Sequence, residues 1–241
     1  MRHIEKKNVC DDFEAFVVKK KLENYVQTYL QSKKRSKLKT PWKKFTQSRE
    51  GGEIKITLHS HLLNEQQGLC IYCQQAIPEK LENPIAYSHI EHIKERNLHA
   101  HLTFKHKNLS VSCNGFDCSI EEPEVIEDFC GHTKGELGQK QGIEEGLFLN
   151  PIEIADIENF FEYDFEGNIA PNTDRNQIDQ QKAKYMIDLL DLQNKNLIQL
   201  RINQLDDINA RILEKFDVEA FLDKTAEKLP AFFSMLKQFF P

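Results

Sequence analysis

Apolar residues in the first part of the chain recur at helical spacing. Between residues 11 and 31 they follow a period close to 3.6, which predicts an amphipathic helix. The periodic positions are Phe13, Phe16, Val17, Leu22, Tyr25, Val26 and Leu30. A turn is expected at Gly51-Gly52, followed by a short helix over 58–67 that ends at Gly68, because glycine commonly follows the last residue of a helix.

The pattern changes twice in the rest of the chain. Short β-favouring runs at 85–93 and 109–112 predict strands, and the segment 150–173, with Gly167 and two prolines, predicts a strand or hairpin. From Asp174 onward a long amphipathic periodicity that includes Arg201 predicts helices. The stretch 217–241 is apolar on more than one side of a helix, so burial in the chain's own core is favoured over a partner-binding surface.

Composition narrows the class of protein. The 241 residues are 39% hydrophobic, which supports one sizeable core or two modest ones. The segment MRHIEKKNVC is charged and lacks the apolar run of a secretory signal, and no stretch approaches the roughly 18 apolar residues of a membrane span. A cytoplasmic location is therefore expected. Thiols stay reduced there, so the five cysteines between 70 and 130 favour a metal site over disulfides.

Charge is distributed unevenly along the chain. Residues 1–50 carry a net charge of +8, whereas 51–150 and 151–241 each carry −7. The segment 31–49 has eight basic residues and no acidic one, with Trp42 and Phe45 among them. This composition is typical of a segment that contacts phosphates, and Lys43 and Lys44 are candidate nucleic-acid contacts.

Cys70 and Cys73 form a C-x-x-C pair, whose two thiolates can bind one Zn²⁺ in tetrahedral geometry. A structural zinc site needs a second pair, which has to come from Cys113, Cys118 and Cys130. Cys113 and Cys118 enclose four residues, a longer turn than the usual two. Cys118 and Cys130 thus remain alternatives for the fourth ligand.

Between the cysteines the chain carries side chains suited to phosphodiester hydrolysis. A neutral histidine with an ordinary pKa of about 6.5 can take a proton from water at neutral pH, and His92 is the candidate base. Glu91 can hold a divalent cation that neutralises charge on a phosphate. Neighbours on a regular strand point to opposite faces, so joint action requires the strand to end or bulge here. His89 shares a face with Glu91 and is an alternate ligand.

These motifs stand in the order C-x-x-C, Glu-His-Ile, Asn-Leu, Cys and Cys-x-x-x-Lys. The order resembles the zinc-containing HNH endonucleases of the ββα-metal class. The strings EQQGLCIYC, YSHIEHIK, NLSVSCNG and CGHTKG are similar to the HNH nuclease subunits, termed PtuB, of Septu and retron-associated antiphage systems. The resemblance covers roughly 58–135 and continues more loosely through DFEGNI and LLDLQNKNLIQLR.

The resemblance implies roles for further residues. Asn108 matches the Asn of the motif and is expected to orient the catalytic histidine. A second ligand for a catalytic Mg²⁺ or Mn²⁺ is expected at or beside Gly131, where His132 is the nearest candidate, and Lys134 is expected to contact phosphate. The closing motif favours Cys130 as the fourth zinc ligand. The structural zinc ligands are then Cys70, Cys73, Cys113 and Cys130.

The resemblance also implies partners. They are a nucleic-acid substrate, a controlling ATPase (PtuA in that family) and a retron reverse transcriptase with its nucleic acid, in an antiphage complex. DNA is favoured over RNA, although both present the same phosphodiester. The alternative function is a zinc-stabilised module that binds nucleic acid or protein without catalysis. It is disfavoured because such a module has no need of Glu91, His92 and Asn108 between its zinc ligands.

We therefore expect an α+β, mainly helical fold in three parts. Residues 1–57 form a helical and basic N-terminal arm, and 58–149 form the zinc-stapled ββα-metal module. Residues 150–241 form a helical C-terminal region, for which docking of a partner is the alternative to burial of its apolar stretch.

Overall fold

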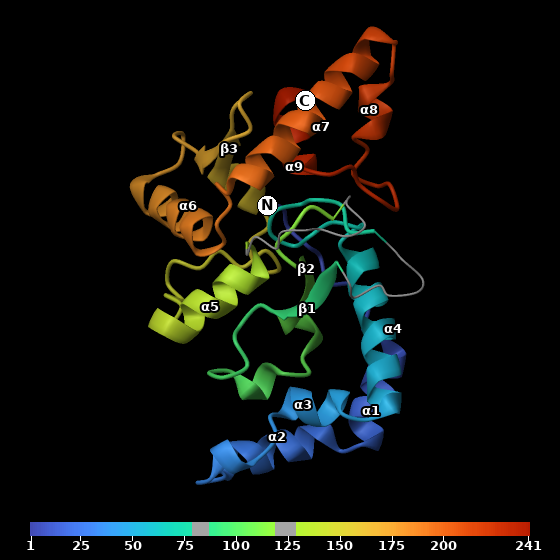
Figure 1. Ribbon diagram of the computed structural model, residues 1–241, viewed down its shortest axis with the longest axis vertical. Coiled ribbons are helices and arrows are strands. Elements are labelled where there is room, and N and C mark those ends of the chain that lie inside the picture. Colours follow the sequence, from blue (N-terminus) through green and yellow to red (C-terminus); the bar gives the residue numbers. More distant parts are fainter. Residues whose placement is uncertain (79–86, 119–128) are drawn as a thin grey trace.

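The computed structural model describes residues 1–78, 87–118 and 129–241 (Figure 1). The described chain is mainly helical with two small antiparallel sheets, so the α+β expectation is confirmed. The α-helices are α1 (Asp11–Lys19), α2 (Leu22–Gln31), α3 (Pro41–Thr46), α4 (Arg49–Glu65), α5 (Gly131–Gln141), α6 (Gln177–Leu189), α7 (Lys195–Leu213), α8 (Val218–Phe221) and α9 (Phe233–Phe239). The strands are β1 (Ser88–His92), β2 (Leu109–Cys113), β3 (Phe161–Tyr163) and β4 (Ile169–Pro171), and the 3₁₀ helices are η1 (Arg35–Lys37), η2 (Ala100–Leu102), η3 (His106–Asn108) and η4 (Ile157–Phe160).

The helix expected over 11–31 is two helices. Lys21 has a left-handed backbone with φ of 52°, an uncommon conformation for a residue with a side chain, and it separates α1 from α2. The arm is held by aromatic packing, since the rings of Phe13 and Phe16 lie 5.5 and 5.6 Å from that of Phe45 on α3. The rings of Phe13 and Phe45 also lie 6.3 and 6.1 Å from that of Phe104, which anchors the arm to the central part of the protein.

The expected turn at Gly51-Gly52 is wrong, because both residues lie in the first turns of α4. The hydroxyl of Ser48 accepts a hydrogen bond from the backbone N–H of Gly51 (3.0 Å) and so caps the helix. A Cβ atom at Gly51 would lie 2.0 Å from the carbonyl oxygen of Phe45, which explains the glycine by close packing and not by a turn. The expected end of this helix before Gly68 is confirmed, and Gly68 has a φ of +81°.

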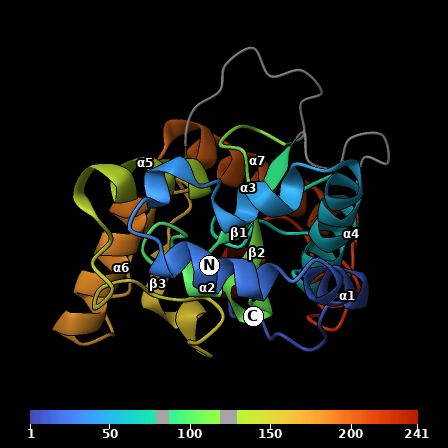
Figure 2. The same cartoon turned by 90° about the horizontal axis from the view of Figure 1, so that it is seen from below.

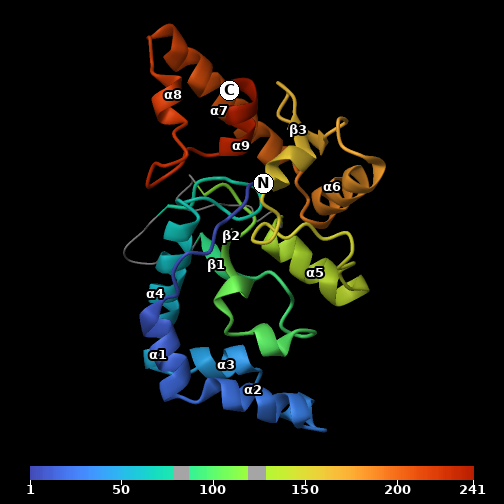
Figure 3. The same cartoon turned by 180° about the vertical axis from the view of Figure 1, so that it is seen from behind.

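The two central strands form an antiparallel pair in regular register, from Ser88 opposite Cys113 to His92 opposite Leu109. The expected strand 85–93 is confirmed in its described part, while residues 85 and 86 lie outside the described residues. Figures 2 and 3 show this pair between α4 on one side and α5 on the other. The helices thus cover the strands that carry the candidate chemistry.

The C-terminal half follows the pattern closely. The hairpin expected in 150–173 is β3 and β4, and the periodic segment after Asp174 forms α6 and α7. Arg201, at an apolar position of the pattern, is 1% exposed, and its guanidinium donates to the carbonyl oxygens of Gly167 (3.0 Å) and Leu192 (2.8 Å). The apolar stretch 217–241 contributes Leu222, Met235 and other residues to the core, as expected.

One hydrophobic core draws residues from all three expected parts, and α4 runs from the first part into the second. The basic arm and helices α7 to α9 lie at opposite ends of the long axis (Figures 1 and 3). No helix among the described residues has the length and apolarity that crossing a membrane requires.

Candidate active site and metal centre

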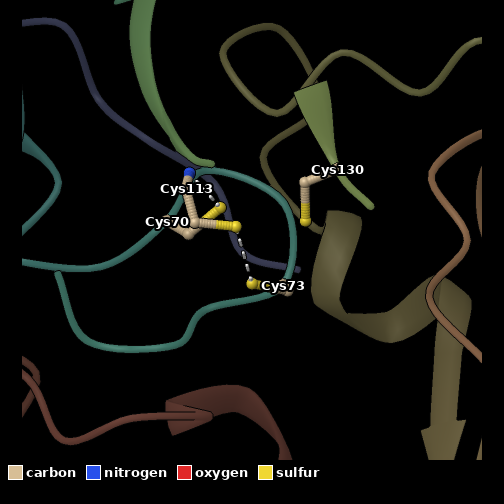
Figure 4. A group of neighbouring side chains, drawn as sticks. All are labelled: Cys70, Cys73, Cys113 and Cys130. Atoms are coloured by element: carbon tan, nitrogen blue, oxygen red, sulfur yellow. Dashed lines mark hydrogen bonds between the residues drawn. The ribbon is translucent and has the colours of Figure 1, made fainter. Parts of the chain in front are cut away.

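Four cysteine thiols from separate segments meet in the core (Figure 4). Cys70 and Cys73 lie in the loop after α4, Cys113 ends β2, and Cys130 precedes α5. All four are buried, and their sulfur atoms lie within 4.8 Å of one another. The Sγ atoms of Cys73 and Cys113 are 3.8 Å apart. A tetrahedral site with Zn–S bonds of about 2.3 Å has sulfur atoms about 3.8 Å apart, so this donor set fits zinc.

Cys118, the alternative fourth ligand, lies outside this group. Its thiol is 3.6 Å from the carbonyl oxygen of Tyr87 and 3.7 Å from that of Phe116, and it donates to both. Burial raises the pKa of the Cys118 thiol well above its ordinary value, so the thiol stays protonated. The structure brings Cys130, and not Cys118, to the other three cysteines.

Glu91 is a buried carboxylate with its two oxygens in different surroundings. Oε1 accepts hydrogen bonds from the Tyr72 hydroxyl (3.0 Å) and from the Lys134 ammonium. Oε2 lies 3.5 Å from Nε2 of His89. Burial by itself would raise the carboxyl pKa, but the charges and hydrogen bonds of Lys134 and His89 outweigh it and lower the pKa of Glu91 to about 2. The carboxylate is therefore ionised, and Oε2 faces the imidazole side of the site.

Polar side chains gather beside this oxygen at the start of α5. Nδ1 of His89 lies 2.9 Å from Oδ1 of Asn114, and the ring of His132 packs edge-on against His89 at 4.8 Å between centroids. A Cβ atom at Gly131 would lie 2.7 Å from Nε2 of His89. The space that a side chain at 131 would fill is thus taken by the ring of His89, the alternate ligand, which lies on the same strand face as Glu91.

His92 ends β1 and contacts a different set of residues from Glu91. Its ring packs edge-on against Trp42 of α3, with centroids 4.7 Å apart, and Nε2 lies 3.1 Å from the carbonyl oxygen of Thr103. A carbonyl only accepts, so Nε2 carries the proton and Nδ1 the lone pair. Burial and the nearby Arg96 charge lower the pKa of His92 to about 3, which keeps the imidazole neutral at pH 7. The strand ends at His92 and has no bulge. An end of the strand is one of the two alternatives that would allow Glu91 and His92 to act together.

Asn108 holds the loop between β1 and β2, which contains Thr103, the hydrogen-bond partner of His92. Its Oδ1 accepts from the backbone N–H of Lys94 (2.7 Å), and its Nδ2 donates to the carbonyl oxygens of Lys94 (3.1 Å) and Leu102 (3.3 Å). Thr103, whose carbonyl binds His92, follows Leu102 directly. Asn108 is 4% exposed and therefore stabilises this loop from inside.

The lysines expected to contact nucleic acid lie in two settings. Lys134 is 2% exposed, and its ammonium binds the Glu91 carboxylate and the carbonyl oxygen of His92 (3.0 Å). The Lys134 ammonium thus faces Glu91 within the core, and its expected contact with phosphate stays a prediction. Lys43 and Lys44 are exposed on α3, the helix whose Trp42 packs against His92.

Tyr72, Thr103 and Trp42 were not anticipated from the sequence as neighbours of the site. Tyr72 stands inside the C-x-x-C pair, whose prediction as a zinc site rests on the spacing of the two cysteines alone. Thr103 acts through its backbone carbonyl, for which residue type gives no signal. Trp42 carried a signal, since an aromatic residue within a basic segment is uncommon, but the sequence does not say what it packs against.

No family model matches the chain. A curated protein of Escherichia coli, named "Retron Ec83 putative HNH endonuclease", is 27% identical to it over 143 residues. The match covers 54% of this chain and 53% of that protein, so the chain spans about half the length of the curated relative that it matches. This distant similarity supports a nuclease of the HNH type and does not extend to the PtuB subunits in particular.

Proposed function

We propose that this protein is a metal-dependent HNH endonuclease that hydrolyses phosphodiester bonds of nucleic acid, with DNA as the favoured polymer. One observation carries the proposal: two antiparallel strands and the start of α5 bring Glu91, His89 and His132 together beside four clustered thiols, with His92 at the end of the first strand. The similarity to a retron HNH protein supports the same conclusion.

In this proposal the four-cysteine site holds zinc in a structural role. Four thiolates fill a tetrahedral ion and leave no position for substrate, as in other closed structural sites. The cysteines come from the loop after α4, the end of β2 and the residue before α5. Zinc would therefore fix α5 against the strands that carry Glu91 and His92.

Hydrolysis requires a base, and His92 is suited to that role through Nδ1. The neutral imidazole takes a proton from the attacking water, and the Thr103 carbonyl stabilises the imidazolium that forms. Burial is the larger cause of the lowered pKa of His92 and the Arg96 charge the smaller one; the negative charge of a bound phosphate would offset the contribution of Arg96 and so raise the pKa. Asn108 is a positioning residue, because it holds the loop that presents Thr103.

Residues of β1 and of the start of α5 together fit a catalytic cation. Oε2 of Glu91 and Nε2 of His89 are 3.5 Å apart, close to the spacing of two ligands on one ion, and His132 adds a second imidazole. Glu91, with His132 or His89, would hold Mg²⁺ or Mn²⁺. Such an ion, when bound, neutralises charge on the scissile phosphate and on the leaving oxygen. The Lys134 ammonium keeps Glu91 ionised and fixes its orientation.

The basic arm would bind the phosphate backbone. The cations of its basic segment 31–49 are exposed, and they are Lys33, Lys34, Arg35, Lys37, Lys39, Lys43, Lys44 and Arg49. Because α3 also packs against His92, polymer held by the arm would lie next to the base. This juxtaposition favours a polymeric substrate over a small phosphate ester.

We further propose that the nuclease is an effector of antiphage defence. The name of the retron relative and the resemblance to Septu and PtuB sequences support this role. A PtuA-like ATPase would control the activity, and a retron reverse transcriptase with its nucleic acid would belong to the same complex.

The decisive experiment is cleavage of plasmid DNA and total RNA by the wild type and His92→Ala, with Mg²⁺ or Mn²⁺, alone and with any ATPase that copurifies. His101→Ala, which removes an exposed histidine of η2, is the matched control. Cleavage by wild type and control but not by His92→Ala, with the same zinc content of at least about one ion per chain in all three, is the expected result. If none of them cuts even with the partner while all hold zinc, the binding-module function replaces the nuclease.

A further inference from the structure

A second group of metal-ligating side chains lies outside the proposed nuclease site. His61 and Glu65 are four residues apart on α4 and so share one face of that helix, and His106 of η3 lies against them. One ligand atom from each of the three lies within 4.8 Å of the others. His61 and Glu65 also line a large open groove, which gives water access to the cluster.

A hydrogen bond to the backbone sets the tautomer of His61. Its Nε2 lies 2.9 Å from the backbone carbonyl oxygen of Asn8, and a carbonyl only accepts, so Nε2 carries the proton. Nδ1 therefore has the free lone pair. Histidine ligands typically donate their other N–H to a carbonyl or carboxylate in this way, which fixes the ring and increases its basicity.

Glu65 and His106 are already close to the spacing of two ligands on one ion. Nε2 of His106 is 2.9 Å from Oε1 of Glu65. Two ligands at about 2.0–2.1 Å from a tetrahedral ion are about 3.3 Å apart, so the pair would need to open by only a few tenths of an ångström. The second oxygen, Oε2, is held by the Lys6 ammonium at 2.9 Å, which orients the carboxylate but also competes with a cation.

We propose that His61, Glu65 and His106 form a site for a divalent transition ion of the zinc class. Two imidazoles and one carboxylate favour such ions over Mg²⁺, which prefers oxygen ligands and retained water. Three protein ligands leave a fourth position for water on the groove side. The ion would join α4 to η3, which leads directly into β2, and so would stabilise the fold next to the nuclease strands.

The test is Co²⁺ binding to the full-length protein as purified, measured by equilibrium dialysis with metal analysis and by visible absorption. The wild type is expected to bind cobalt at this site, with no thiolate-to-cobalt band because zinc keeps the four cysteines. His61→Gln and His106→Gln each remove one donor and are expected to weaken binding by at least the roughly 10- to 100-fold that loss of an outer-shell partner costs. His101→Gln, which removes an exposed histidine, is the matched control and is expected to bind cobalt as the wild type does.

Two further variants separate this site from its rivals. Cobalt that is retained by Glu91→Gln but lost by His61→Gln belongs to this site and not to the nuclease site. Lys6→Gln keeps all three donors and removes the competing ammonium, so it is expected to bind cobalt several-fold tighter than the wild type. If a histidine variant does not fold, the cobalt affinity of Lys6→Gln relative to the wild type still tests whether the ion binds at this cluster. Failure of both the wild type and Lys6→Gln to bind the extra ion, or unchanged affinity in both histidine variants, would show that the cluster is only an ion-pair network.

Discussion

Two buried charges, Glu91 and Lys134, face each other where β1 meets α5. Removing one partner of a buried pair leaves an uncompensated charge, so Lys134→Met is expected to lower the free energy of unfolding by about 3–5 kcal/mol. The double variant Glu91→Gln, Lys134→Met removes both charges and is expected to cost less than the sum of the single changes. Denaturant unfolding of the zinc-loaded proteins measures this cycle, and additive losses would contradict the pairing.

Substitution of Cys130 and of Cys118 is expected to have different effects, although both cysteines are buried. Cys130→Ser is expected to release zinc and to unfold the region around α5, because a structural zinc site contributes directly to folding free energy. Cys118→Ser is expected to keep zinc, since this thiol lies against carbonyl oxygens and outside the four-cysteine group. Metal analysis and circular dichroism of both variants check this, and the reverse pattern would assign the fourth ligand to Cys118.

Residue identity and spacing predicted a good part of the site. Spacing alone selected the Cys70 and Cys73 pair, and the resemblance to the HNH nucleases selected Cys130 over Cys118 for the group that the fold brings together. The burial of Lys134 could not be predicted, because sequence spacing does not reveal which side chain pairs with which across 43 positions. The close contact of His89 with Gly131 was equally hidden, since it depends on how α5 meets the strands.

The start of α5 depends on two glycines with different surroundings. A methyl group at Gly131 would lie 2.7 Å from the His89 ring, whereas one at Gly135 would meet nothing within 4 Å. Gly131→Ala is expected to displace His89, weaken Mn²⁺ binding and reduce cleavage, with zinc retained. Gly135→Ala is the control on the same helix, and alanine there is expected to stabilise the protein by about 0.5–1 kcal/mol. Equal Mn²⁺ affinity in the two variants would argue against His89 as a neighbour of the cation.

Helices and strands could be predicted where one hydrophobic period ran through the segment. They were harder to predict where a turn signal and a helix signal fell on the same residues. The hairpin in 150–173 and the helices after Asp174 follow their patterns, and they appear as β3, β4, α6 and α7. The periodic run 11–31 contains no glycine or proline to signal the break at Lys21. Gly51-Gly52 resembles a turn in sequence, yet Ser48 caps a helix that includes both residues, and only Gly51 is explained by the close approach of the Phe45 carbonyl oxygen.

At the scale of the whole molecule, the three expected parts share one core, and helix α4 links the arm to the central strands. Packing between parts is not encoded in any local period, so sequence patterns assign segments more readily than they assign contacts between segments. The contact of Trp42 with His92 is such a case, and it joins the basic arm to the base of the proposed nuclease.

Because Trp42 of the arm contacts His92, the arm is expected to bind the nucleic-acid polymer, and substitution of its lysines tests this. Lys43→Gln, Lys44→Gln is expected to weaken DNA binding and to reduce the slope of log affinity against log salt by about 0.9 for each duplex phosphate that a lysine no longer neutralises. Lys215→Gln, Lys224→Gln removes two exposed lysines from the C-terminal region and is the charge-matched control. Both variants keep His92 and the zinc ligands, so fold and zinc content should not change. A salt slope that falls equally in both variants would mean that overall charge, and not the arm, attracts the polymer, and the substrate path would then have to be sought away from α3.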